Sequence, residues 1–198
     1  YVLRKESKFL FLSFLSFALI ILLRPVNLIV LLLIPFFFSS FLDFTNEIKI
    51  LFRKPRTLVI GILIAFALIS LQLLVWYKEA GSFFIWSYYG EGFYFSKPEI
   101  LNVLFSFKKG LFIYTPLTLI SLVGLYFVFQ KNKFRFAVIA LFLTCCTYII
   151  SSWWVWYYCD SFGHRAFVDF YSVFALLLGI LLTEIKQKAG KIFFLSIC

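Results

Sequence analysis

The residues best suited to bind a charged ligand lie in one short segment of the second half of the chain. Residues 153–165 contain Asp160, His164, which is the only histidine, and Arg165. A guanidinium group can hold a phosphate through two parallel hydrogen bonds. Asp169 follows Arg165 by four residues, so an ion pair on one helix face is the alternative to a ligand-binding role for this arginine. Because the sequence has one histidine, it cannot form a metal site that needs several, and we predict no metal-binding residues.

Two further cations, Lys108 and Lys109, stand at the end of a helix that we predict over residues 97–109. The sequence of residues 96–99, Ser-Lys-Pro-Glu, fits the Ser-x-x-Glu capping box, and Gly110 supplies a stop. The apolar residues of this helix share one face, as in helices that lie in the membrane interface. The two lysines then either meet a lipid phosphate or complement the helix dipole beside bulk lipid.

Aromatic side chains crowd the same parts of the chain. All five tryptophans lie in or beside the segments 78–110 and 153–166. Aromatic faces stack on sugar rings and isoprenoid chains, and we select Tyr88, Tyr89 and Trp156 as candidates for such contacts. The alternative is that these rings anchor the loops among lipid headgroups and pack the ends of helices.

The elements that position these residues must be membrane helices, because the composition excludes a soluble fold. Hydrophobic residues make up 63% of the 198, against about 45–50% in globular chains. A span needs roughly 17–25 apolar residues. Arg24-Pro25 interrupts the first apolar stretch and predicts a tight turn, and Pro35 predicts a kink. We therefore predict a single all-α transmembrane domain with six spans, 9–23, 26–42, 57–77, 111–129, 136–156 and 167–183, and a partial seventh from Ile192.

The net charge of +10 is explained by the orientation of these spans. If the spans alternate in direction, thirteen Lys and Arg lie on one side and six on the other. The positive-inside rule then places the N-terminal end of the chain in the cytoplasm and the segments 78–110 and 153–166 outside. The basic excess thus reports topology, which removes the case for a nucleic-acid partner.

Two segments of the sequence resemble a known family. Residues 109–116, Lys-Gly-Leu-Phe-Ile-Tyr-Thr-Pro, and residues 156–169, which run from Trp156 to Asp169, resemble the C-terminal half of bacterial GT-C glycosyltransferases. These are multi-spanning enzymes similar to protein mannosyltransferases. The Arg-Pro turn at Arg24 is similar to one seen in many of them. Cys159-Asp160 is a departure, since small residues are expected before Ser161.

The resemblance implies transfer of a sugar from a polyprenyl-phosphate carrier to a glycan, lipid or protein acceptor at the outer face of the bacterial cytoplasmic membrane. The catalytic carboxylate of such enzymes sits in an outer loop near the N-terminus. We interpret this chain as a C-terminal fragment, so the catalytic residue is expected upstream of Tyr1. No cofactor is identifiable.

The residues expected to contact the lipid phosphate or substrate are Arg24, Lys109, Arg165, His164, Tyr88, Tyr89 and Trp156. Two alternatives to an enzyme stay open at this point. One is a non-enzymatic transporter or flippase of lipid-linked glycans, which would also need an aromatic outer vestibule. The other is a structural membrane subunit.

Overall fold

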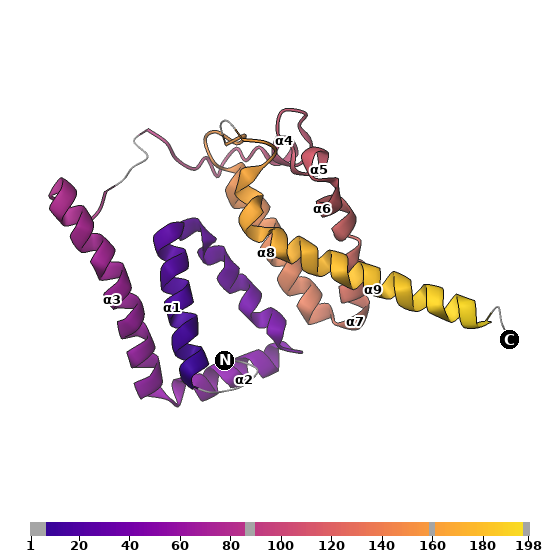
Figure 1. Cartoon of the computed structure of the whole chain (residues 1–198), viewed down its shortest axis with the longest axis horizontal. Coiled ribbons are helices and arrows are strands. Elements are labelled where there is room, and N and C mark those ends of the chain that lie inside the picture. Colours follow the sequence, from indigo (N-terminus) through magenta and orange to yellow (C-terminus); the bar gives the residue numbers. More distant parts are fainter. Residues whose placement is uncertain (1–6, 86–89, 159–160, 196–198) are drawn as a thin grey trace. The chain divides into compact units, whose positions relative to one another are not determined.

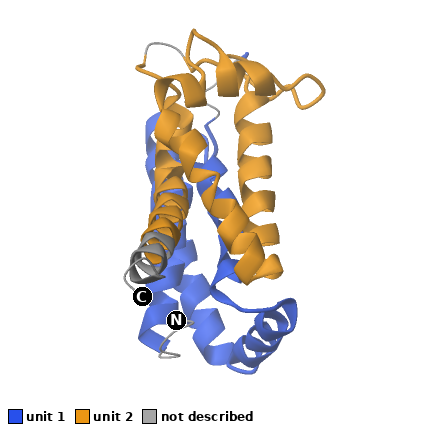
Figure 2. Cartoon of the chain, turned by 90° about the vertical axis from the view of Figure 1, so that its right-hand side faces the viewer, with its two compact units in different colours: residues 1–90 blue, residues 91–198 orange. Residues whose placement is uncertain are grey.

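The computed structural model describes residues 7–85, 90–158 and 161–195, with side chains described as far as Gln187. Within these ranges the chain is all-α, with nine α-helices and two 3₁₀-helices, which confirms the predicted fold class. The chain divides into two compact units, residues 1–90 and 91–198 (Figure 1; Figure 2). Each unit is described by itself.

Unit 1 contains a helical hairpin followed by two further helices. Helix α1 (Ser7–Leu23) and the 3₁₀-helix η1 (Pro25–Phe37) pack against each other on either side of a break at Arg24. Proline at the first position of η1 fits there because that position needs no N–H partner within the helix. The predicted Arg-Pro turn is therefore confirmed. Helices α2 (Phe41–Phe52) and α3 (Pro55–Ala80) follow.

A close contact between α1 and α3 organises unit 1. Gly61 of α3 lies against the ring of Phe14, and a Cβ atom at this glycine would overlap that ring. On α1, Leu10 and Ala18 are buried. The absence of a side chain at position 61 thus lets an aromatic ring fill the space between two long apolar helices.

Unit 2 begins with short helical pieces and ends with long helices. The pieces are α4 (Ile100–Phe105), α5 (Leu111–Tyr114), α6 (Pro116–Ser121) and α7 (Gly124–Lys131). The breaks follow from local chemistry, because proline starts α6 and glycine starts α7. The remaining elements are α8 (Lys133–Ser151), the 3₁₀-helix η2 (Arg165–Phe170) and α9 (Tyr171–Leu195).

The core of unit 2 lies where α6, α7 and α8 meet η2 and α9. The rings of Phe142 and Phe170 pack edge to face with centroids 5.6 Å apart, and both are buried. Gly124 of α7 meets the backbone of α9 so closely that a Cβ atom there would overlap the carbonyl oxygen of Leu177.

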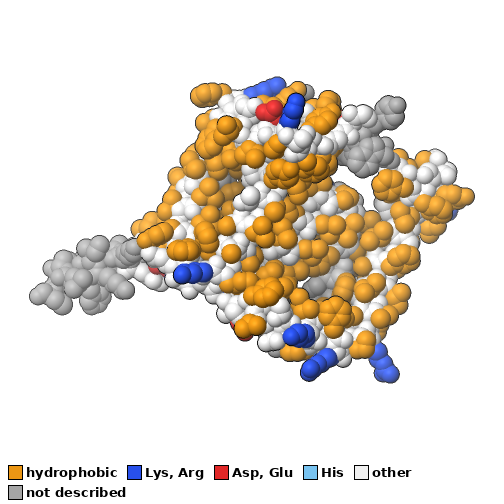
Figure 3. Space-filling view, turned by 180° about the vertical axis from the view of Figure 1, so that it is seen from behind, with side chains coloured by type: hydrophobic (Ala, Val, Ile, Leu, Met, Phe, Trp, Pro, Cys, Tyr) orange, Lys and Arg blue, Asp and Glu red, His pale blue; other side chains and the backbone are white. Residues whose placement is uncertain are grey.

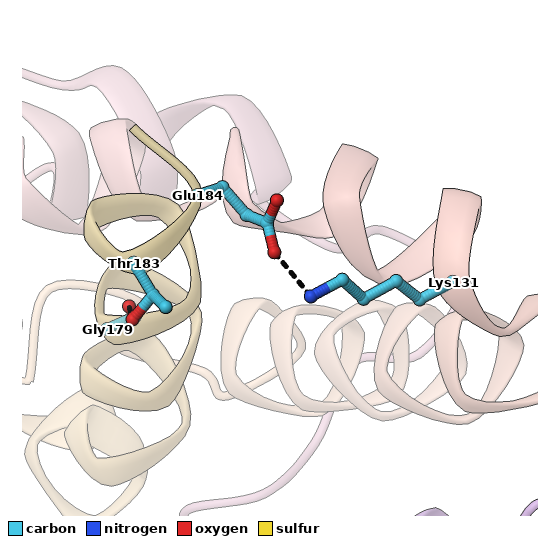
Figure 4. A network of polar contacts seen from close by, with 4 residues as sticks. All are labelled: Lys131, Gly179, Thr183 and Glu184. Atoms are coloured by element: carbon cyan, nitrogen blue, oxygen red, sulfur yellow. Dashed lines mark hydrogen bonds and ion pairs between the residues drawn. The ribbon is translucent and has the colours of Figure 1, made fainter. Parts of the chain in front are cut away.

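A polar contact joins the same two helices farther along. Lys131 at the end of α7 forms an ion pair with Glu184 of α9, and the Thr183 hydroxyl beside it donates to the Gly179 carbonyl oxygen at 2.8 Å (Figure 4). Because Thr183 is bonded within its own helix, the ion pair is the polar link between the two helices in this view.

The described residues contain three helices long and apolar enough to cross a membrane. They are Pro55–Ala80, Lys133–Ser151 and the continuous stretch Arg165–Gln187. A fourth is reached if Pro25–Phe37 and Phe41–Phe52, which meet at a bend of 108°, form one broken span. Hydrophobic side chains cover most of the face seen in Figure 3, with isolated Lys and Arg among them. The chain is a multi-pass membrane protein with three to four candidate spans.

The prediction of six spans and a partial seventh is therefore wrong, for three reasons. The predicted span 9–23 corresponds to α1, whose 17 residues cover only about 25 Å. The predicted span 111–129 is divided among α5, α6 and α7. The partial seventh span from Ile192 continues α9 without a break.

The predicted interfacial helix over 97–109 is also wrong in its extent, because α4 covers only Ile100–Phe105. A capping box would require the Glu99 N–H to donate to the Ser96 side chain. That N–H instead donates to the carbonyl oxygen of Ser151 at 2.9 Å, and Glu99 itself becomes the residue before the helix. A tertiary hydrogen bond thus replaces the local cap.

We expect Gly124→Ala to lower the free energy of unfolding by about 1–3 kcal/mol, because the added methyl group would overlap the α9 backbone. Gly179→Ala on α9 is the matched control, since a Cβ atom there meets nothing within 4 Å. Unfolding in detergent micelles, followed by circular dichroism, measures both. Equal stability of the two variants would show that α7 and α9 do not meet at Gly124.

Candidate functional site

Two segments far apart in the sequence, residues 106–116 and 153–164, come together at one end of unit 2. The Lys109 ammonium donates to the Ser161 hydroxyl at 3.4 Å. The ring of Tyr114 meets that of Phe162 edge to face, with centroids 5.4 Å apart. The first segment therefore contacts the turn after α8, and the two together form the candidate site.

A second cation also joins the two segments. The Lys108 ammonium lies over the Tyr157 ring, 3.3 Å from its centroid. A cation placed on an aromatic face is attracted by the negative charge density of the ring. Lys108 is therefore held by a ring, whereas Lys109 is held by a hydroxyl.

The turn after α8 needs two residues with left-handed backbone conformation. Tyr158 has φ of 50° and Gly163 has φ of 60°. A Cβ atom at Gly163 would lie 3.1 Å from the Cβ of Tyr114, so glycine suits this position for its conformation and for its size. Tyr158 is stabilised by donating its hydroxyl to the Ile150 carbonyl oxygen at 3.2 Å.

His164 is the buried centre of this turn, with only 1% of its surface exposed. Its Nε2 atom lies 3.0 Å from the Trp156 carbonyl oxygen. A carbonyl can only accept, so Nε2 carries the proton and Nδ1 holds the lone pair of the neutral ring. Nδ1 has no hydrogen-bond partner among the described residues. The rings of Tyr158 and Phe167 pack on the imidazole with centroids 5.3 and 5.2 Å away.

The surroundings of His164 keep its imidazole neutral. Burial lowers the pKa of His164 to about 4, and the positive charge of Lys109 acts in the same direction. The carbonyl oxygen of Trp156 opposes this shift without cancelling it. The site therefore combines half-buried Lys109 with an uncharged imidazole ring.

A row of aromatic rings supports the turn from the side of α8. Phe93 and Phe95 stack with centroids 5.4 Å apart, Phe95 stacks on Tyr148 at 5.8 Å, and Phe93 meets Trp153 edge to face at 4.8 Å. The backbone follows the same path, because the Tyr94 N–H donates to the Ser152 carbonyl oxygen at 2.6 Å. The segment before α4 is thereby fixed to the end of α8.

The structure brings three of the predicted site residues together: Lys109, Trp156 and His164. Arg165 is the next residue along, exposed at the first position of η2. Asp169, with which an ion pair was the alternative to a ligand role for Arg165, is exposed in the same 3₁₀-helix.

Of the other predicted site residues, only Arg24 is described by the structure. Arg24 is exposed at the break between α1 and η1 in unit 1. Tyr88 and Tyr89 lie outside the described residues, as do Cys159 and Asp160. Among the described residues, Lys109, Trp156 and His164 lie together in unit 2, with Arg165 next to His164 in the chain.

Sequence reasoning did not select Ser161, Tyr114 or Tyr158 for this site. Ser161 and Tyr114 both stand in the two segments that carry the family resemblance, which was the available signal. The contacts of Tyr158 depend on its left-handed backbone, for which a tyrosine gives no local indication.

Chemically, the arrangement suits an anion. Lys109 supplies a positive charge in a partly desolvated position, where its attraction for an anion is stronger than in water. The Ser161 hydroxyl now donates to the Gly163 carbonyl oxygen at 3.2 Å. If it rotates away from that oxygen, it can donate to an anion instead. Among the described residues no three His, Cys, Asp or Glu side chains are grouped to hold a metal ion.

Comparison with protein-family models, with curated protein sequences and with solved structures returns no match to this chain. The established description is therefore that of an all-α membrane protein with three to four candidate spans.

We expect the stability of the protein to contain a pH-dependent contribution from His164. Its folded-state pKa of about 4 lies below the 6.5 of a free imidazole, so between these values only the unfolded state binds the proton. Lowering the pH from 6.5 to 4 should then destabilise the fold by on the order of 3 kcal/mol.

The matched variant is His164→Gln, which keeps a donor for the Trp156 carbonyl oxygen but cannot titrate. The difference in unfolding free energy between wild type and variant should shrink as the pH falls through this range, because other groups titrate in both proteins. A difference that stays constant from pH 7 to pH 4 would contradict a buried, neutral imidazole.

Proposed function

We propose that the chain is part of a membrane glycosyltransferase of the GT-C type, which transfers a sugar from a polyprenyl-phosphate carrier to an acceptor at the outer face of the bacterial cytoplasmic membrane. The observation that supports this most is that the two segments carrying the family resemblance pack against each other. Lys109 meets Ser161, and Tyr114 meets Phe162 and Gly163.

The charge distribution of the site fits the departing half of such a reaction. When the sugar leaves, the carrier phosphate gains negative charge, which a preorganised cation stabilises. In our proposal Lys109 contacts this phosphate, and the exposed Arg165 beside the turn provides a second cation. His164 stays neutral and positions the turn through Trp156.

We assign no residue to deprotonate the acceptor. Glu99, an acid at this end of unit 2, accepts a hydrogen bond from the Asn102 side chain at 2.7 Å. That contact stabilises the start of α4, which is a structural role. Arg24 is retained as a third candidate for a phosphate contact, in unit 1.

The test is transfer of a labelled sugar from its polyprenyl-phosphate carrier by the protein, expressed from its complete reading frame and reconstituted in proteoliposomes. We expect Lys109→Ala to lower kcat/KM for the carrier by about 10- to 100-fold, the effect of losing one charge-assisted hydrogen bond. Lys109→Arg should restore part of the loss, because it keeps the positive charge.

Lys97→Ala is the matched control, since Lys97 is an exposed lysine of the same unit outside the site. Equal activity of Lys109→Ala and Lys97→Ala would overturn the assignment of Lys109. Movement of the carrier across the bilayer without any sugar transfer would instead favour a transporter or flippase. If Lys109→Ala impairs neither sugar transfer nor movement of the carrier, a structural subunit is favoured.

A further inference from the structure

Two phenylalanines at the site end of unit 2 are more exposed than the other large hydrophobic side chains that the structure describes. Phe107 is 87% exposed and Phe162 is 88% exposed. Each lies in a turn, one between α4 and α5 and the other just before η2. Exposing two such rings to water is unfavourable, so this surface calls for an apolar partner.

The two phenylalanines are held in place by one residue, Tyr114. Its hydroxyl donates to the Phe107 carbonyl oxygen at 2.8 Å, and its ring packs edge to face on Phe162. Gly163 lets the second turn approach, because a Cβ atom at this position would lie 3.1 Å from the Tyr114 Cβ. The two rings are therefore presented by ordered turns that share an anchor.

The position of these turns along the chain indicates which partner they meet. The turn with Phe162 separates two candidate spans, Lys133–Ser151 and Arg165–Gln187. The turn with Phe107 is joined to it through Tyr114 and through Lys109. Both turns thus stand where spans end, which is the depth of the lipid headgroups.

The charges beside the two rings complement an anionic membrane surface. Lys108 follows Phe107 directly and is exposed, and Arg165 follows Phe162 by three residues and is exposed as well. The Lys108 ammonium also lies over the Tyr157 ring, which fixes its direction. An apolar side chain with a cation close behind it is the pattern of membrane-interface segments that favour anionic lipids.

We propose that Phe107 and Phe162 insert together into the interfacial layer of the bilayer, with Tyr114 as the positioning residue, and that Lys108 contacts the headgroups of anionic lipids. This aromatic pair takes the role that sequence reasoning gave to a helix over 97–109. The proposal does not depend on sugar transfer, because it concerns the lipid of the membrane itself.

Photocrosslinking tests the proposal in the full-length protein. The photoreactive amino acid p-benzoylphenylalanine replaces Phe107 or Phe162, and the protein is reconstituted in vesicles of phosphatidylcholine with a minority of phosphatidylglycerol. After irradiation, mass spectrometry should find lipid adducts at both positions. Phosphatidylglycerol should be enriched in these adducts about two- to fivefold over its share of the vesicle.

Two substitutions separate the parts of the proposal. Lys108→Ala should abolish much of the enrichment at position 107, whereas Lys97→Ala should leave it intact. Tyr114→Phe removes only the hydroxyl, so it should lower the adduct yield at position 107 and spare position 162, which contacts the ring. If Tyr114→Phe leaves the adduct yield at position 107 unchanged, the positioning role of Tyr114 is overturned.

The remaining outcomes overturn the contact itself. A crosslinked dimer would show that the two rings bind a second copy of the chain. The absence of lipid adducts would show that they face water or another part of the protein. Adducts without enrichment of phosphatidylglycerol would refute the contact between Lys108 and anionic lipid.

Discussion

Backbone hydrogen bonding at the ends of helices is the constraint on which unit 2 depends. Ser151 and Ser152, where α8 ends, are buried, so their carbonyl groups need partners within the protein. The carbonyl oxygens of Ser151 and Ser152, at the end of α8, accept from the backbone N–H groups of Glu99 and Tyr94. The Trp156 carbonyl oxygen accepts from His164. The path of the segment before α4 and the shape of the turn after α8 both follow from satisfying these groups.

The same constraint decides the electrostatics of the candidate site. Because the imidazole of His164 is committed to a backbone carbonyl and enclosed by Tyr158 and Phe167, it cannot readily carry a charge. Lys109, which is only half-buried, has the Ser161 hydroxyl as its partner. His164 therefore stabilises the backbone of the turn, whereas Lys109 is the residue that can attract a charged ligand.

Local sequence signals predicted some of these elements and missed others for identifiable reasons. The Arg24-Pro25 break was predicted because a proline interrupts an apolar run, and it is present. The loop predicted over 153–166 ends earlier, because η2 begins at Arg165. The capping box before α4 failed because the Glu99 N–H has a partner fifty residues away. The burial of His164 was equally out of reach, since it depends on rings from both sides of the turn. The contact between Lys109 and Ser161 was not predicted, although both residues stand in the segments that carry the family resemblance.

The 3₁₀-helix of unit 1 has a consequence for how membrane segments are counted. A 3₁₀-helix rises about 2.0 Å per residue, so the 13 residues of η1 cover about 26 Å. The 17 residues of α1 cover about 25 Å at the α-helical rise. The two arms of the hairpin therefore match in length although they differ in residue number. For this hairpin the thickness that it can occupy in a bilayer is set by helix type as much as by the number of residues, and a fixed window of residues would judge its arms unequal.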